Sequence, residues 1–151
     1  MKRPKDISYA KWLAQYYLSF RMHTKREIVD KLRKKEVEES IIEECLEFLE
    51  EYKFIDDFDY ACRYIKDASN IKRYGRFKIT GKLLIKGIDS DIIDSAFDEI
   101  EIDNKPILLK LIERKKDKEP DKIINYLRGR GFSYNEIKEA MDEFTEQDNA
   151  F

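Results

Sequence analysis

The chain has 151 residues, 41% of them charged and 42% hydrophobic, and its 30 Lys and Arg nearly cancel 32 Asp and Glu to leave a net charge of −2. This balance permits a folded domain, whereas 5 Gly and 3 Pro are too few for a turn-rich β protein or a collagen-like chain. The small net charge argues against coating DNA by bulk electrostatics. No apolar run approaches the ~18 residues that span a membrane, and the N-terminus lacks the apolar core of a secretion signal. We therefore expect a cytoplasmic protein whose two cysteines, Cys45 and Cys62, are buried thiols.

One apolar pattern occurs three times along the chain, with the spacing of a helix, a tight turn and a second helix. The first copy comprises Ile28, Leu32, Val37, Ile42, Cys45, Leu46 and Leu49. The second comprises Ile79, Leu83, Ile88, Ile93, Ala96, Phe97 and Ile100, and the third Ile123, Leu127, Phe132, Ile137, Ala140, Met141 and Phe144.

A further amphipathic stretch precedes each copy, so every unit contains three helices. We predict an all-α fold of three tandem three-helix repeats, helix-turn-helix-like units at residues 1–55, 56–103 and 104–151, stacked into an elongated, curved rod. The predicted helices lie near 8–21, 25–35, 39–52, 57–70, 76–86, 90–100, 105–117, 120–130 and 134–146.

Helix ends follow from local signals. Gly87 and Gly131 stand where the chain turns between the second and third helices, and glycine takes the left-handed conformation there at little cost. The first repeat has Glu36 instead, so its turn is either different or strained by about 1 kcal/mol. The spacings Thr24–Glu27 and Ser133–Glu136 predict capping boxes.

Charge is sorted by helix. Second helices are mostly basic and third helices mostly acidic, so repeats stacked in one orientation would present a basic and an acidic stripe. The middle repeat is the clearest case, because residues 68–88 contain no acid and interleave six cations with Tyr74 and Phe77. Each cation alone could be solvated or could complement a helix dipole. Together they favour binding to phosphate or to an acidic protein groove.

No constellation of catalytic residues is apparent, and we expect neither an enzyme nor a cofactor or metal. His23 is the single histidine, and both cysteines lie on core positions of the pattern. The pair Asp56–Asp57 stands at a predicted helix start, where capping explains it better than metal binding. We interpret Trp12 and Tyr16–Tyr17 as packing residues of the first repeat.

Several segments together resemble the RecX family, regulators of the RecA recombinase. The resemblance follows the same three-unit order over nearly the whole chain, and it departs at Glu36, where glycine is common. The segments that carry it are Ala10–Leu13, Thr24–Leu32, Phe54–Ala61, Arg73–Ile88 and Tyr126–Tyr134.

The resemblance implies a non-catalytic regulator of recombination, DNA repair and the SOS response. It implies binding in the groove of the RecA filament on single-stranded DNA, with inhibition of ATP hydrolysis, strand exchange and co-protease activity. A direct nucleic-acid-binding module and a generic helical-repeat adaptor are the alternatives. The candidate contact residues are Lys72, Arg73, Arg76, Lys78, Lys82, Lys86, Arg128 and Arg130.

Overall fold

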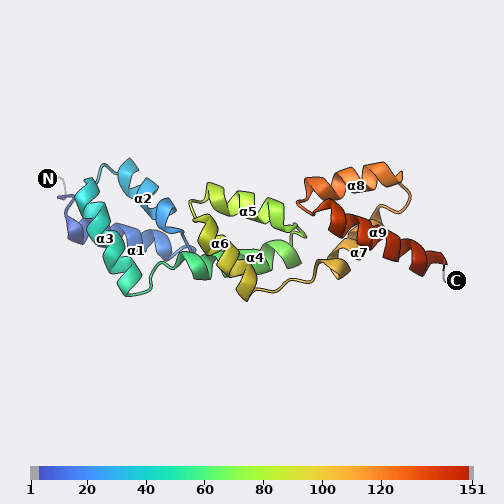
Figure 1. Ribbon diagram of the computed structural model, residues 1–151. Coiled ribbons are helices and arrows are strands. Elements are labelled where there is room, and N and C mark those ends of the chain that lie inside the picture. Colours follow the sequence, from blue (N-terminus) through green and yellow to red (C-terminus); the bar gives the residue numbers. More distant parts are fainter. Residues whose placement is uncertain (1–3, 150–151) are drawn as a thin grey trace. The chain divides into compact units, whose positions relative to one another are not determined.

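All regular secondary structure in the described part of the chain is helical. The computed structural model describes residues 4–149, and within them nine α-helices and no strand are present (Figure 1). The helices are α1 (Ile7–Leu18), α2 (Lys25–Lys34), α3 (Glu39–Glu51), α4 (Asp57–Asn70), α5 (Arg76–Ile85), α6 (Ser90–Glu99), α7 (Asn104–Arg114), α8 (Pro120–Gly129) and α9 (Tyr134–Asn149). The predicted all-α order is confirmed. The first helix ends earlier than predicted because the Ser19 hydroxyl donates to the Tyr16 carbonyl at 2.6 Å and closes the last turn.

Packing divides the chain into two compact units, which are described separately. One comprises residues 1–61 with 83–96, and the other residues 62–82 with 97–151. No helix in the described residues is long and apolar enough to cross a membrane.

The core of the first unit lies among α1, α2 and α3. Ala10 and Leu13 of α1 face the pattern positions of α2 and α3, where Ile28, Leu32 and Leu49 are fully buried. Burying a side chain of this size contributes about 1.5–3 kcal/mol, so the repeated pattern supplies most of the stabilisation of this core.

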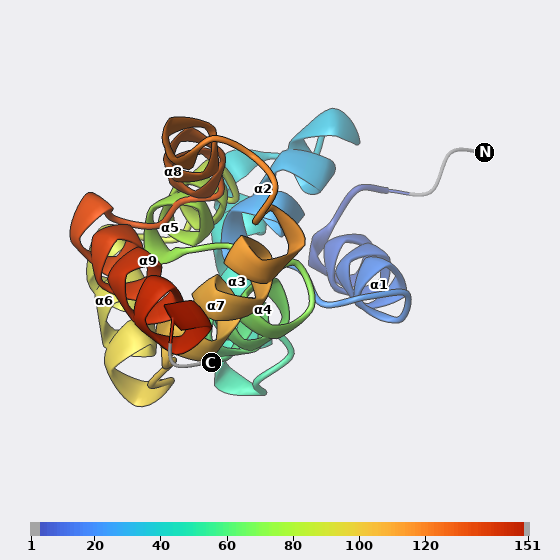
Figure 2. The ribbon, with the colours of Figure 1, turned by 90° about the vertical axis from the view of Figure 1, so that its right-hand side faces the viewer.

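The corresponding core of the second unit lies among α7, α8 and α9. Leu108 and Ile112 of α7 pack with Leu127 of α8 and Ile137 of α9. Figure 2 shows α9 running beside α7, and these two helices make the most extensive packing contact of the unit. In the middle repeat the pattern positions from Ile79 to Ala96 are buried as well, so the predicted periodicity is confirmed in all three copies.

The turns between second and third helices have the same form in all three repeats. Their central residues have φ of 60° (Glu36), 88° (Gly87) and 100° (Gly131). The next amide closes each turn onto the last helical turn, as in Val37 N–H to the Leu32 carbonyl at 3.1 Å. The first turn is therefore not different: Glu36 adopts the strained left-handed conformation, and its exposed carboxylate lies 3.4 Å from Lys5 Nζ.

The predicted caps are present. Thr24 and Glu27 form a complete capping box at α2, and Ser133 and Glu136 form one at α9. Asp56 and Asp57 separate in role: Asp56 caps α4 through the Asp59 amide at 3.1 Å, whereas Asp57 accepts the Lys25 amide at 2.9 Å and so caps α2. Both carboxylates are thus accounted for by helix starts.

One expectation about the first repeat is wrong. Trp12 and Tyr16, interpreted as packing residues, are each 49% exposed, and they stack on one another with ring centroids 5.8 Å apart. Tyr17, by contrast, is half-buried against the core. The buried face of α1 is instead formed by Ala10, Leu13 and Ala14. These smaller side chains allow α1 to approach α3 closely.

The two cysteines are free and buried, as predicted. Burial raises the pKa of the Cys45 thiol to about 11. Because the thiolate is the reactive form, this side chain behaves as an apolar core residue.

His23 is buried in the corner between α1 and α2. Its Nδ1 lies 3.0 Å from the Arg21 carbonyl, which only accepts hydrogen bonds, so Nδ1 carries the proton of the neutral ring. The buried Nε2 has no hydrogen-bond partner among the described residues. Burial, with the nearby charges of Arg21 and Lys31, lowers the pKa of His23 despite the opposing effects of the hydrogen bond to the Arg21 carbonyl and of Glu27.

We expect stability to fall when His23 is forced to take up a proton. The unfolded chain binds that proton near pH 6.5 and the folded chain only at lower pH, so the free energy of unfolding decreases as pH falls below about 6.5. Urea unfolding between about pH 7.5 and 5.5 measures this slope, which should flatten in His23→Phe. An equal slope in the variant would assign the pH dependence to other groups.

Candidate binding surface

Three of the predicted contact cations gather around one aromatic ring. Tyr74, in the loop before α5, has Lys78 Nζ 4.5 Å, Lys82 Nζ 5.7 Å and the Arg130 guanidinium carbon 5.1 Å from its ring centroid. Lys78 and Lys82 lie one turn apart on α5, and Arg130 lies at the end of α8. We call these four residues the Tyr74 cluster. Cation–π attraction holds like charges together at a ring face where they would otherwise repel.

Arg130 also holds the backbone of the cluster. Its Nε donates to the Arg73 carbonyl at 3.2 Å and its Nη2 donates to the Lys72 carbonyl. Arg73 has a left-handed φ of 57°, and its carbonyl is turned toward α8. Arg130 is therefore a structural residue as well as a candidate contact residue, whereas the side chains of Lys72 and Arg128 are exposed.

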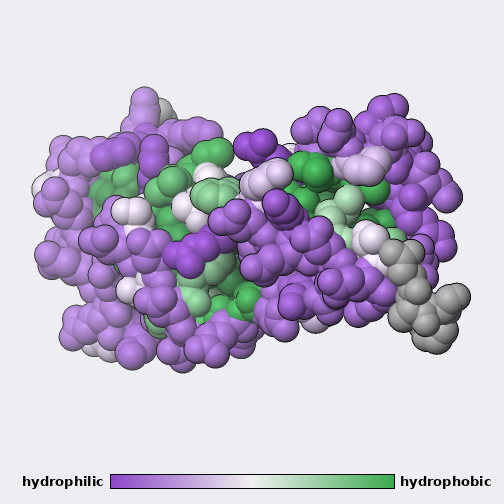
Figure 3. Space-filling model, turned by 45° about the vertical axis from the view of Figure 1, so that its right-hand side comes forward, coloured by the Kyte–Doolittle hydropathy of each residue, from purple (hydrophilic) through white to green (hydrophobic). Residues whose placement is uncertain are grey.

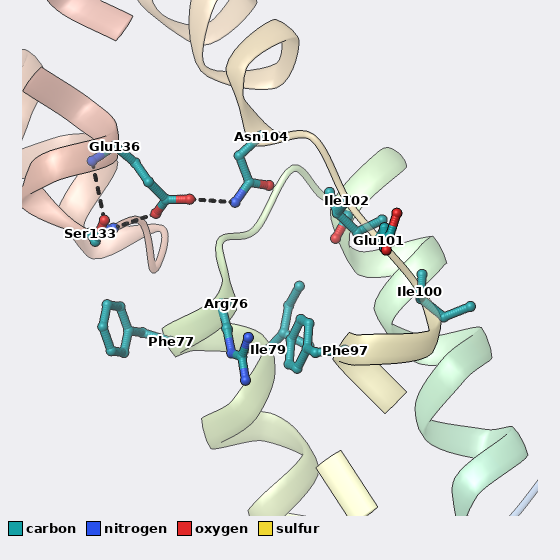
Figure 4. Close-up of a pocket in the computed structure, with 11 residues that line it drawn as sticks. Arg76, Phe77, Ile79, Phe97, Ile100, Glu101, Ile102, Asn104, Ser133 and Glu136 are labelled. Carbon is teal, nitrogen blue, oxygen red and sulfur yellow. Dashed lines mark hydrogen bonds between the residues drawn. The ribbon is translucent and has the colours of Figure 1, made fainter. Parts of the chain in front are cut away.

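Arg76 lies in a different environment from the Tyr74 cluster. Its guanidinium carbon lies 4.5 Å from the centroid of the Phe97 ring. Figure 4 shows Arg76 beside Phe97, with Phe77 pointing away from this pair. Arg76 and Phe77 line a half-open groove that ends at the Ser133–Glu136 capping box, where Asn104 Nδ2 donates to Glu136 Oε1 at 2.7 Å. Phe77 is 69% exposed, so an aromatic face is available beside a cation.

Lys86 belongs to the other compact unit, so it is not part of the Tyr74 cluster. Its Nζ lies 5.9 Å from the Tyr60 centroid, and its carbonyl accepts the Thr24 hydroxyl at 2.7 Å. Lys115 was not among the predicted residues, yet its Nζ lies 4.5 Å from the Tyr126 ring, which Arg130 also contacts. Sequence spacing gave no signal for this neighbour, because the shared ring belongs to a different helix.

The start of α5 carries two cations. Its first turn contains no acidic residue and instead carries Arg76 and Lys78 at the positive end of the helix dipole. The first turns of α1 and α7 also lack an acidic residue, whereas α8 has Asp121 and α2 has Glu27. Cations placed there do not complement the helix dipole, so the dipole does not explain Arg76 and Lys78.

Hydrophilic side chains cover most of the face seen in Figure 3, with hydrophobic ones visible in the gaps between them. In the unit that holds the Tyr74 cluster, Phe77 on α5 is an exposed apolar side chain beside the cations. A surface of this composition suits recognition of a partner that presents acidic groups beside apolar ones.

Comparison with known proteins identifies the family. The model of the first three-helix domain of RecX matches residues 10–49, and the model of the second matches residues 56–96. The regulatory protein RecX of Clostridium acetobutylicum is 36% identical over 93% of this chain and 71% of its own length. The chain belongs to the RecX family.

Other relatives extend the same finding. The regulatory protein RecX of Streptococcus pneumoniae is 34% identical over 94% of this chain, and the crystal structure of RecX from Lactobacillus salivarius superposes with a TM-score of 0.81 at 30% identity. That structure covers 93% of this chain and 97% of its own. The chain spans 58% of the length of the S. pneumoniae relative.

Proposed function

We propose that this RecX-family chain is a cytoplasmic, non-catalytic regulator that binds the RecA filament on single-stranded DNA. Binding inhibits the ATPase, strand-exchange and co-protease activities of RecA, and through them recombinational repair and the SOS response. The observation that carries the proposal is the Tyr74 cluster, in which three cations converge on one ring next to the exposed Phe77.

The chemistry of the cluster supports a partner whose charged groups repeat along its length. Lys78 and Lys82 form no ion pair with an acid of residues 4–149, so their charges remain available. A charged groove that repeats along a filament can engage several such groups, and many weak contacts combine into strong binding. Lys72, Arg73, Arg76 and Arg128 extend the proposed contact surface in the same unit. Lys86, in the other unit, is proposed as a separate contact residue.

A direct nucleic-acid-binding module is the alternative that the same cluster suggests, because cations beside aromatic rings also bind phosphates and stack bases. The sequence pI of about 5.7 and the acidic third helices oppose tight binding to bare DNA. No described feature favours a generic adaptor over these two.

Binding measurements separate the two functions. We expect the chain to bind the cognate RecA filament on single-stranded DNA at least about tenfold more tightly than the same DNA alone at physiological salt. Fluorescence anisotropy of the labelled chain, titrated with filament and with bare DNA, measures this ratio. Equal affinities would favour the nucleic-acid module, and capture of neither ligand would favour the adaptor.

A further inference from the structure

Two junctions between consecutive repeats use equivalent residues. At the first, the N-terminus of α2 contacts the turn between α5 and α6: the Thr24 hydroxyl donates to the Lys86 carbonyl at 2.7 Å, and the Arg26 side chain covers Gly87. A Cβ atom at Gly87 would lie 2.1 Å from Arg26 Cδ. The turn must therefore be glycine for the helix end to approach it.

The second junction repeats this arrangement inside the other compact unit. The N-terminus of α5 contacts the turn between α8 and α9, where Gly75 N–H donates to the Arg130 carbonyl at 2.8 Å and Phe77 N–H to the Gly131 carbonyl at 3.1 Å. A Cβ atom at Gly131 would lie 2.5 Å from the backbone nitrogen of Lys78. In both junctions a helix N-terminus thus sits on a glycine turn of the following repeat.

When the three repeats are aligned in this way, one turn and one helix N-terminus take part in no such junction among the described residues. The turn of the first repeat, at Lys35 and Glu36, is exposed, although Gly131 is buried in the corresponding place. The N-terminus of α8, at Glu119 to Lys122, is exposed, although Thr24 and Gly75 are buried in the corresponding place. This turn and this helix N-terminus, the two open ends, correspond to the two sides of a third junction. Each formed junction joins one repeat to the next, so a single molecule cannot form the third one with itself in the same way.

The open helix end keeps the groups that a junction needs. The two amides that donate at the second junction belong to Gly75 and Phe77, which align with Glu119 and Asp121. Pro120 aligns with the residue between them, so the proline removes neither donor. Both sides carry mixed charge: Glu119 and Asp121 lie between the exposed Lys118 and Lys122, and the open turn follows Lys34 and Lys35.

Glu36 is what keeps the open turn from acting as an acceptor. Its backbone has the left-handed conformation of the two glycine turns, with φ of 60°. It therefore presents the same carbonyls, but it carries the Cβ that both junctions exclude. Glu119 likewise adds a long side chain where the two formed junctions have threonine or glycine.

We propose that the turn at Lys34–Val37 is a latent docking surface for the N-terminus of α8 of a second copy of this chain. The Cβ of Glu36 and the side chain of Glu119 close it. Glu36 and Glu119 thus prevent head-to-tail assembly of copies of this chain. Without them, an interface of this heterologous kind would extend without closure.

The test rebuilds the first junction at the open ends. The double variant Glu36→Gly, Glu119→Thr reproduces its glycine turn and threonine helix start. The control Glu36→Ala, Glu119→Thr removes the same two carboxylates but keeps a Cβ at the turn. Sedimentation velocity over about two orders of magnitude in concentration should show a monomer for wild type and control, and concentration-dependent association for the glycine variant.

Two results would overturn the proposal. Association of glycine and alanine variants to the same extent would show that charge, not the Cβ, closes the turn. A monomeric glycine variant with unchanged circular dichroism would show that these ends do not dock.

Discussion

Replacing Gly131 by alanine is expected to lower the free energy of unfolding by about 2–5 kcal/mol. Left-handed backbone costs a non-glycine residue about 1–2 kcal/mol, and overpacking adds about 1–3 kcal/mol. Both costs apply here, because Gly131 has φ of 100° and a Cβ would meet the backbone of Lys78 at 2.5 Å. Backbone cannot rotate away as the end of a side chain can, so the α5 N-terminus must shift.

Urea denaturation of Gly131→Ala measures this loss, and Gly129→Ala is the matched control. Gly129 lies two residues earlier, near the end of α8, and a Cβ there would meet nothing within 4 Å. The control should be unchanged or up to about 1 kcal/mol more stable, because alanine favours a helix over glycine. Equal stability of Gly131→Ala and wild type would mean that the second junction contributes little to the fold.

The second large effect concerns the Tyr74 cluster. The double variant Lys78→Glu, Lys82→Glu should raise the concentration needed to inhibit RecA by at least about tenfold, since it reverses two charges at the centre of the proposed contact. These lysines are preferable to Arg130, whose loss would also release the carbonyls of Arg73 and Lys72.

A control variant with the same net charge separates the effect of where the lysines lie from the effect of the total charge. Lys110→Glu, Lys138→Glu changes two exposed lysines on α7 and α9, outside the cluster. It should inhibit RecA nearly as well as wild type, and both double variants should keep the circular dichroism of the parent. If the two double variants inhibited RecA equally poorly, the loss of inhibition would result from overall charge and not from the position of the lysines.

The repeated core could be predicted from sequence because its signals are local. Positions such as Ile28 and Leu32 recur at helical spacing, and capping boxes such as Thr24–Glu27 lie within four residues. Glu36 shows the limit: the sequence left two geometries open, and the structure has the glycine-like turn because that turn closes with the same backbone hydrogen bonds in every repeat.

The candidate surface was predictable in composition but not in arrangement. An acid-free window marked Lys78 and Lys82, yet their gathering with Arg130 around Tyr74 depends on contacts between residues far apart in the chain. The exposure of Trp12 was missed for the same reason, because helical periodicity finds a face without showing what covers it.

The measurement that tests the account most directly is the steady-state ATPase rate of the cognate RecA on single-stranded DNA. If this RecX-family chain acts on the filament as proposed, the rate falls at substoichiometric chain, and Lys78→Glu, Lys82→Glu requires more protein for the same fall. A rate that stays unchanged up to equimolar chain would contradict the proposed function.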